Sequence, residues 1–197
     1  MVYCGEVLEK QVGLIRTYIS LSPSSTNMQI LTTIFRDPGL DIHGKTDHRI
    51  AVRAVAIREK KLLMVYSPVN GDYKFPGGGV SKKEKFEYAL KREVQEECGM
   101  NLMHILQNIG CIIEYAIPLK KKFDVFKMTS NYYLCELDSI TFEQRLDPYE
   151  KRLGFQPVWV DIDTALQTNT AILETKKPPK WTAREVFMLE YIRKNLL

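Results

Sequence analysis

The sequence predicts the α/β (α+β) class, with a mixed β-sheet that helices cover on both faces. The chain has 197 residues, of which 45% are hydrophobic and 26% charged, a balance typical of a globular domain of ordinary size. Short apolar runs typical of strands are interleaved with segments of helical periodicity. The two kinds of segment do not follow the regular strand–helix–strand rhythm of a parallel sheet, which favours a mixed sheet.

The first part of the chain, residues 1–48, is predicted to be an extension of helix plus strand. Residues 6–20 have one apolar helical stripe, which the segment 21–25, LSPSS, interrupts. Residues 28–35 read as a strand, and Asp37-Pro38-Gly39 reads as a turn. This segment has no cluster of acids, histidines or cysteines at metal-ligand spacing, so we expect it not to carry the chemistry. The apolar stripe consists of Leu8, Val12, Ile15 and Ile19.

The core domain is predicted to span residues 49–197. It begins with an apolar strand over 49–58, a turn at 59–61 and a second strand over 62–66, and a Gly/Pro-rich loop follows at 75–79. Residues 84–98 have helical character, and Gly99 can cap that helix in a left-handed conformation. Further strands are expected over residues 109–117, 125–128, 132–137 and 158–160. A last helix begins at Thr182-Ala183-Arg184-Glu185, which has the form of a capping box, and its apolar stripe consists of Val186, Leu189, Ile192 and Leu196.

Charge and cysteine content place few limits on function. The net charge is +4 and the pI about 8.8, which suits an anionic substrate and is too weak to indicate a nucleic-acid partner. No apolar run approaches the ~20 residues of a membrane helix, and the first residues do not resemble a signal peptide. The cysteines form no CxxC pair, so we expect reduced thiols in a cytoplasmic protein. They are Cys4, Cys98, Cys111 and Cys135.

The helix over residues 84–98 places acids on its apolar side. With ~100° per residue, Glu93 and Glu97 fall within about 20° of Phe86, and Glu96 lies about 80° away. Burying unpaired carboxylates costs several kcal/mol or more, and crowding them adds repulsion. A hard cation such as Mg²⁺ or Mn²⁺ offsets that cost; the alternative is a helix whose glutamates pair with Arg or Lys. The face expected to be buried consists of Phe86, Ala89, Leu90 and Val94.

Three successive glycines, Gly77, Gly78 and Gly79, precede this helix. Glycine lets the backbone approach a ligand closely and present N–H groups to phosphate oxygens. It also permits a tight strand-to-helix turn without any ligand. Beside a buried acidic cluster, however, the loop and the acids together would make a pocket for a diphosphate.

The segment from Gly78 to Met100 resembles the box of the Nudix hydrolases, G-x5-E-x7-R-E-U-x-E-E-x-G-U, where U is a bulky aliphatic residue. Every specified position is filled, with Met100 accepted as the last aliphatic residue. Many relatives carry Gly directly before the first Glu of the box, whereas this chain has Lys83, which would alter the local turn. The specified residues after Gly78 are Glu84, Arg92, Glu93, Val94, Glu96, Glu97, Gly99 and Met100.

The resemblance implies an αβα sandwich with a mixed β-sheet, a bound Mg²⁺ or Mn²⁺ and, as in many relatives, a homodimer. The acids would bind the metal, with Glu84 as a supporting ligand. Arg92 would orient a glutamate, while Glu93 or Glu96 would act on the water. The glycines Gly77, Gly78 and Gly79 would bind metal or phosphate through their backbone. The implied metal ligands are Glu93, Glu96, Glu97 and Glu84.

The activity implied is hydrolysis of a phosphoanhydride bond in a nucleoside diphosphate linked to another moiety, a small-molecule substrate with no membrane partner. Two alternatives stay open: removal of diphosphate from an RNA 5′ end, and a non-catalytic nucleotide sensor. Glu150 lies where some relatives place an additional glutamate, or it is a surface charge. The Lys120-Lys121-Lys122 run attracts polyphosphate or RNA, or is a solvated loop. Aromatic residues that could stack a base, or belong to the core, are Tyr115, Phe123, Phe126, Tyr132 and Phe155.

Overall fold

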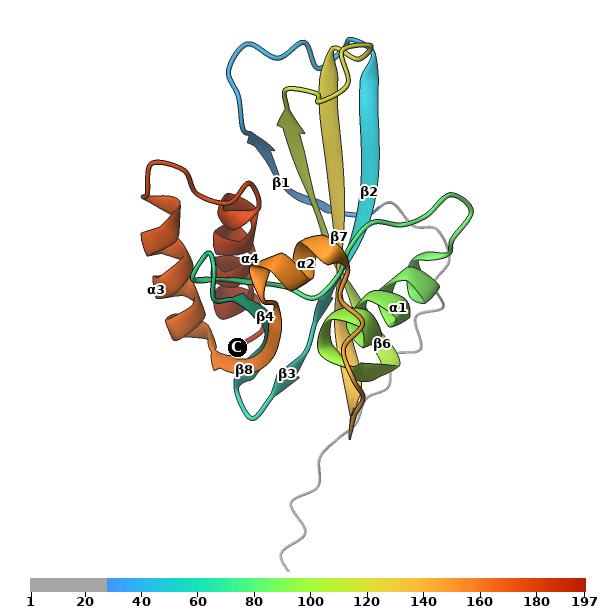
Figure 1. Ribbon diagram of the computed structural model, residues 1–197, viewed down its shortest axis with the longest axis vertical. Coiled ribbons are helices and arrows are strands. Elements are labelled where there is room, and N and C mark those ends of the chain that lie inside the picture. Colours follow the sequence, from blue (N-terminus) through green and yellow to red (C-terminus); the bar gives the residue numbers. More distant parts are fainter. Residues whose placement is uncertain (1–27) are drawn as a thin grey trace, which may run out of the picture.

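Two β-sheets separate helix α1 from helices α3 and α4 in the computed structural model of the chain (Figure 1). The structure describes residues 28–197, apart from the side chains of residues 139–141. Sheet A has the order β1-β6-β7-β2, formed by Ile30–Phe35, Met100–Ala116, Val125–Thr141 and Thr46–Val55. Sheet B has the order β3-β4-β5, with β8 also paired to β4, and is formed by Ile57–Arg58, Lys61–Ser67, Asp72–Lys74 and Gln156–Asp161.

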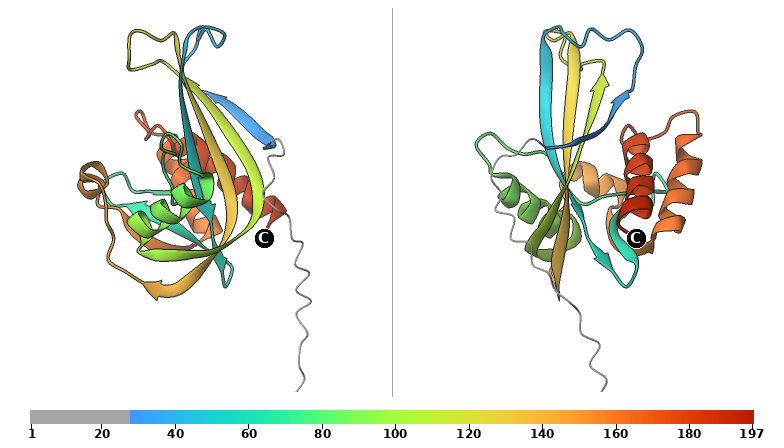
Figure 2. Two further views of the ribbon diagram at one scale, coloured as in Figure 1. Left: turned by 90° about the vertical axis from the view of Figure 1, so that its right-hand side faces the viewer. Right: turned by 180° about the vertical axis from the view of Figure 1, so that it is seen from behind.

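The predicted mixed sheet and αβα sandwich are confirmed. Strand β1 runs parallel to β6, and β2 runs parallel to β7, whereas β6 and β7 are antiparallel. Helix α1 (Phe86–Cys98) lies on one side of the sheets, and α3 (Ile162–Leu173) and α4 (Thr182–Asn195) lie on the other (Figure 2). The short helix α2 (Pro148–Leu153) precedes β8.

One end of sheet A, formed by the long strands β2, β6 and β7, extends beyond the helices (Figure 1). Strand β1 pairs with β6 at the edge of this sheet, with Ile30 opposite Cys111 and Phe35 opposite Tyr115. Part of the predicted extension therefore belongs to sheet A. The helix predicted over residues 6–20 lies outside the described residues, and the domain boundary at 48/49 stays a prediction.

The core has two apolar clusters, one on each side of the sheets. Successive residues of a strand point to opposite faces, so Val52 and Ala54 of β2 pack in the cluster that includes α1, and Val55 packs in the cluster that includes α3 and α4. Arg53 shares the face of Val55 and is only 7% exposed. A charged residue is therefore enclosed on the α4 side of β2.

Helix α4 corrects one sequence-based interpretation. Its N-cap is Trp181 with no side-chain cap, so the capping box predicted at Thr182–Glu185 is wrong. The reason is that the Glu185 carboxylate accepts hydrogen bonds from the Arg184 side chain and from the Phe75 N–H, while the Thr182 N–H donates to the carbonyl of Pro179. The predicted strands 125–128 and 132–137 are one continuous strand, β7. No element was predicted for β5, α2 or α3.

Candidate active site

The face analysis of α1 holds for the acids. Glu93 is 8% exposed and Glu97 1%, beside the buried Leu90 and Val94. Phe86, which was expected to be buried, is 38% exposed, because it is the first residue of the helix and lies outside the apolar cluster that covers the later turns. The helix ends at Cys98, and Gly99 caps it with φ 63°, as predicted.

The glycine loop is fixed against β2 by backbone hydrogen bonds. The N–H of Val52 donates to the carbonyl of Gly78 at 3.0 Å, and the N–H of Val80 donates to the carbonyl of Ile50 at 2.9 Å. At Gly78 a Cβ atom would lie 2.5 Å from the carboxylate oxygens of Glu93. Any larger residue there would collide with an acid of the box, so only glycine lets the loop and the helix approach so closely.

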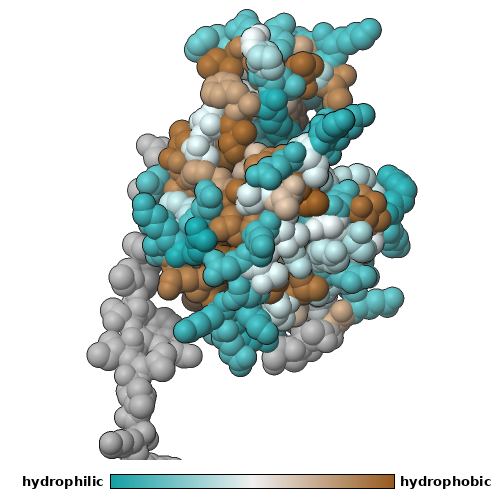
Figure 3. Space-filling model, turned by 90° about the vertical axis from the view of Figure 1, so that its left-hand side faces the viewer, coloured by the Kyte–Doolittle hydropathy of each residue, from teal (hydrophilic) through white to brown (hydrophobic). Residues whose placement is uncertain are grey.

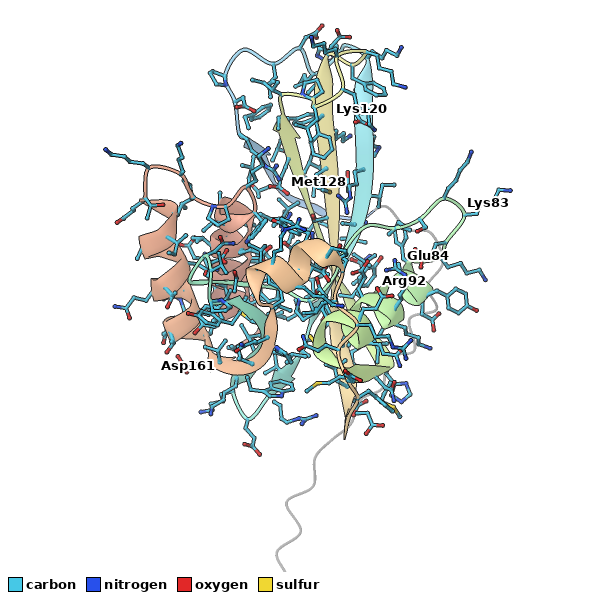
Figure 4. All side chains as sticks on the ribbon, viewed as in Figure 1. Lys83, Glu84, Arg92, Lys120, Met128 and Asp161 are labelled. Carbon is cyan, nitrogen blue, oxygen red and sulfur yellow. The ribbon has the colours of Figure 1, made fainter. Side chains whose placement is uncertain are left out.

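Arg92 gathers three acids around one guanidinium group. It contacts both oxygens of Glu84, at 3.0 and 3.1 Å, and its Nη1 lies 2.7 Å from Glu93 and 3.1 Å from Glu96. Its Nη2 also donates to the carbonyl of Gly79 at 3.1 Å. The Arg92 guanidinium holds the pKa of the Glu84 carboxyl below its usual value. Figure 4 shows Glu84 and Arg92 close together, where the loop meets α1.

Lys83, which departs from the usual glycine, adopts φ 70°. This is the left-handed region that glycine enters at least cost, so the turn keeps the geometry that glycine would have, with a lysine in it. The carboxylate of Glu84, the next residue, accepts a hydrogen bond from the Ser81 N–H at 2.8 Å. The substitution therefore leaves Glu84 within reach of Arg92.

Glu97 faces the start of the glycine loop. One oxygen lies 2.5 Å from Nζ of Lys74, and the other accepts the Gly77 N–H at 2.7 Å. The pKa of Glu93 is raised, first by burial and then by the negative charge of Glu97. Two glutamates of the box therefore share one buried region and repel each other.

Glu150 comes from α2, outside the box. Its carboxylate accepts the Asp147 N–H at 2.9 Å in a capping box at the start of that helix. Burial raises the pKa of Glu150 to about 7, with a further contribution from the charge of Glu97 and an opposing one from Lys74. The charges of Glu97 on α1 and of Lys74 on β5 thus act on the Glu150 carboxyl in opposite directions.

A buried ionic network supports the loop from behind. The Phe75 N–H donates to Glu185 at 3.0 Å, and the other oxygen of Glu185 lies 2.5 Å from Arg184. Arg184 continues to Glu114 at 2.8 Å, and Arg36 of the segment after β1 binds the second oxygen of Glu114 at 2.6 Å. Sequence analysis missed this network. Its signal was present, since Glu114 interrupts an apolar strand and Arg184 and Glu185 begin an amphipathic helix.

Three of the aromatic residues considered for base stacking pack against other parts of the protein. Tyr132 is fully buried against the Phe75 ring, and Phe155 is 3% exposed. Tyr115 stacks on Phe35 with ring centroids 5.5 Å apart.

The run 120–122 lies in the exposed loop at the tip of sheet A (Figure 4, Lys120), where hydrophilic side chains predominate (Figure 3). This exposed position agrees with the interpretation of the lysine run as a solvated loop.

The donor set fits a hard divalent cation. Within residues 28–197, no three His, Cys, Asp or Glu side chains are gathered so as to hold a metal ion. Arg92 and Lys74 form ion pairs with the acids instead. The chemistry still fits, since Glu93 and Glu97 are buried oxygen donors that repel each other, and Mg²⁺ and Mn²⁺ prefer such ligands.

An αβα sandwich that carries acids on a helix after a glycine loop is the arrangement that the resemblance of residues 78–100 implied. A family model described as "NUDIX domain" matches residues 47–181. The chain therefore belongs to the NUDIX family, and the predicted family and class of enzyme, a Nudix hydrolase, are confirmed.

Relatives agree with this assignment. An 8-oxo-dGTP diphosphatase of Buchnera aphidicola is 47% identical over 49 residues, which cover 25% of this chain and only 38% of that protein. The crystal structure of a mutator MutT protein from Bacillus halodurans has a TM-score of 0.52 at 16% identity, covering 75% of this chain and 83% of that one. The Nitrosomonas europaea NUDIX hydrolase has a TM-score of 0.50 at 19% identity, covering 75% and 91%. These structures show the shared fold. None of the described helices is long and apolar enough to span a membrane.

Proposed function

We propose that the chain is a divalent-metal-dependent hydrolase that cleaves a phosphoanhydride bond in a nucleotide-like substrate. The observation that carries this proposal is the arrangement of the box around its loop. Arg92 holds Glu84, Glu93 and Glu96, while Glu97 turns to the Gly77 N–H. Acids, an orienting arginine and backbone donors are thus assembled within one loop–helix unit.

Each residue has a role in this proposal. The acids Glu93, Glu96 and Glu97 would hold Mg²⁺ or Mn²⁺, with Glu84 supporting them through Arg92. When bound, the cation neutralises phosphate oxygens and lowers the pKa of a water molecule. The glycine loop positions the phosphates through its backbone. Three residues are candidates for the base that takes the water proton: Glu93 and Glu96 within the box, and Glu150, whose pKa of about 7 suits that task at neutral pH.

For the substrate, we propose a nucleoside diphosphate linked to another moiety. The relative named 8-oxo-dGTP diphosphatase also brings a nucleoside triphosphate into consideration. Removal of diphosphate from an RNA 5′ end and nucleotide sensing without turnover stay as alternatives. The mildly basic pI of about 8.8 gives the RNA alternative weak support.

A substrate panel separates these alternatives. The full chain is incubated with Mg²⁺ and nucleotide sugars, ADP-ribose, dinucleoside polyphosphates, 8-oxo-dGTP or triphosphorylated RNA, and released phosphate and diphosphate are measured. Turnover of the linked nucleoside diphosphates supports the proposal, and turnover of RNA alone favours the RNA alternative. Binding of nucleotides without any turnover would contradict an enzymatic function.

Metal dependence has its own test. Glu97→Gln keeps the size of the side chain and removes its charge, so we expect weaker Mn²⁺ binding and a loss of rate of several orders of magnitude. Glu87→Gln on the same helix is the control, because that side chain is 54% exposed and pairs with Lys91 on the surface. Full turnover of the wild-type protein in excess chelator would refute the proposal.

The remaining predictions concern the rest of the molecule. We propose that residues 1–48 stabilise the Nudix domain, residues 49–197, and do not take part in the chemistry. The contact of Arg36 with the buried Glu114 supports this role. A homodimer and a cytoplasmic location stay predictions. Deleting residues 1–45 and measuring thermal stability, oligomeric state and substrate affinity would test the role of the extension and the homodimer.

A further inference from the structure

A lysine of the chain itself contacts the carboxylate that the metal is proposed to use. Lys74 is the last residue of β5, and its Nζ lies 2.5 Å from Glu97 Oε1. The side chains are 12% and 1% exposed. With the Gly77 N–H on the other oxygen at 2.7 Å, both oxygens of Glu97 are engaged. Charge-assisted contacts of this length between enclosed groups are strong.

The position of Lys74 is set by its surroundings. Its backbone is held in sheet B, where it pairs with Val65 of β4. Its ammonium group lies 4.6 Å from the centre of the Phe155 ring, a cation–π contact with a residue that is 3% exposed. The lysine is therefore held from two sides, in contrast to a solvated lysine that reaches an acid by chance.

The charges around Lys74 show why a cation is needed there. Arg92 contacts Glu93 and Glu96, and Lys74 forms an ion pair with Glu97. Glu97 acts electrostatically on both Glu93 and Glu150, raising the pKa of each. Without Lys74, the buried Glu97 carboxylate would lose its ammonium partner while its charge still acted on Glu93 and Glu150, a situation that buried carboxylates tolerate poorly.

We propose that Lys74 is a built-in counter-cation, which stabilises the metal-free enzyme and which a divalent cation must displace from Glu97. The inference rests on the proposed function, in which Glu97 binds the metal. A divalent cation and an ammonium group compete for the same carboxylate, so Lys74 weakens metal binding. After displacement, the Lys74 ammonium group would keep its cation–π contact with the Phe155 ring. In this way the site stays folded in the absence of metal and becomes complete on binding it.

The test compares Mn²⁺ binding and thermal unfolding in wild-type protein and in Lys74→Met, which keeps the length of the side chain and removes its charge. Mn²⁺ affinity is measured by electron paramagnetic resonance of the free ion, without any substrate. We expect Lys74→Met to bind Mn²⁺ roughly tenfold more tightly, because a competing charge near the ligand is gone. In chelator its Tm should be lower than that of the wild type, and Mg²⁺ should raise its Tm by more.

Two further variants separate charge from shape. Lys74→Arg keeps the charge and should bind Mn²⁺ as weakly as the wild type. Lys91→Met removes a lysine whose side chain is 45% exposed and pairs with Glu87 on the same helix, so it should change neither quantity. Lys74→Gln serves as a second neutral variant if Lys74→Met does not fold.

The outcomes distinguish the two proposals. Tighter Mn²⁺ binding in the neutral variants, reversed in Lys74→Arg, supports the counter-cation. Equal or weaker binding in the neutral variants overturns this inference and leaves metal-dependent hydrolysis standing. Failure of the wild-type protein to bind Mn²⁺ at millimolar concentration, together with turnover in chelator, overturns both.

Discussion

The carboxylate of Glu185 supports the glycine loop from the opposite side of the sheet, and its charge can be removed with little change in shape. It is fully buried, and it accepts hydrogen bonds from the Phe75 N–H at 3.0 Å and from Arg184 at 2.5 and 3.1 Å. In Glu185→Gln a single amide oxygen replaces the two carboxylate oxygens, and the NH₂ group points at one of the two donors. That buried donor then loses its acceptor. Arg184 also loses one of its two carboxylate partners and keeps Glu114.

The cost can be worked from these contacts. Breaking a buried ion pair from one side costs about 3–5 kcal/mol, and glutamine keeps one of the hydrogen bonds, so we expect a loss of about 3 kcal/mol. For a chain of 197 residues, each kcal/mol corresponds to about 2–4 °C in Tm. The expected fall in Tm is therefore about 6–12 °C, a large part of a stability that is typically about 5–15 kcal/mol.

The assay is urea and thermal unfolding followed by circular dichroism in chelator, so that metal binding does not contribute. Glu190→Gln is the matched control, because Glu190 lies on the same helix and is exposed; it should change the free energy of unfolding by less than about 0.5 kcal/mol. If Glu185→Gln lost less than about 1 kcal/mol, the Glu185 contacts would not hold the loop in the way described.

Three further outcomes are expected. Arg92→Lys keeps the charge but loses the two-point contact with Glu84, so kcat/KM should fall about 10–100-fold; unchanged kinetics would show that Arg92 does not orient the acids. Gly78→Ala would put a methyl group within 2.5 Å of the Glu93 carboxylate, so activity should be lost while the circular dichroism spectrum is kept. If Glu150 is the base, the rate should fall as the pH is lowered through about 7, because only the carboxylate accepts a proton, and Glu150→Gln should abolish this limb; a limb that persists in the variant would point to a glutamate of the box.

Local chemistry made much of the fold and of the box predictable. The 3.6-residue period of α1 was enough to place Glu93 and Glu97 on the buried side. Strand-like apolar runs interleaved with helical segments, without a regular strand–helix–strand rhythm, indicated the mixed class. The burial of Phe86 was predicted wrongly, because periodicity shows which face of a helix is apolar but not which turns of that face other residues cover. The short elements β5 and α2, which bring Lys74 and Glu150 to the site, have too few residues for a periodic signal.

Contacts between distant segments were beyond the reach of sequence patterns. Thr182–Glu185 has the spacing of a capping box, yet the tertiary partners of Glu185 decide its role. The same holds for Glu97, whose neighbour Lys74 comes from a different element. A sequence motif identifies the acids of a site, whereas the positive side chains that neutralise those acids depend on how distant segments pack together.

The contact between Phe75 and Glu185 joins positions 110 residues apart in the sequence. A ribosome releases the box long before it releases α4, since synthesis proceeds from the N-terminus. During that interval the amide at the start of the glycine loop has no carboxylate to bind, and Arg184 is not yet present to neutralise Glu114. The nascent chain therefore carries a complete motif but an unsupported loop, and the order of synthesis makes the last helix the step that completes the catalytic unit.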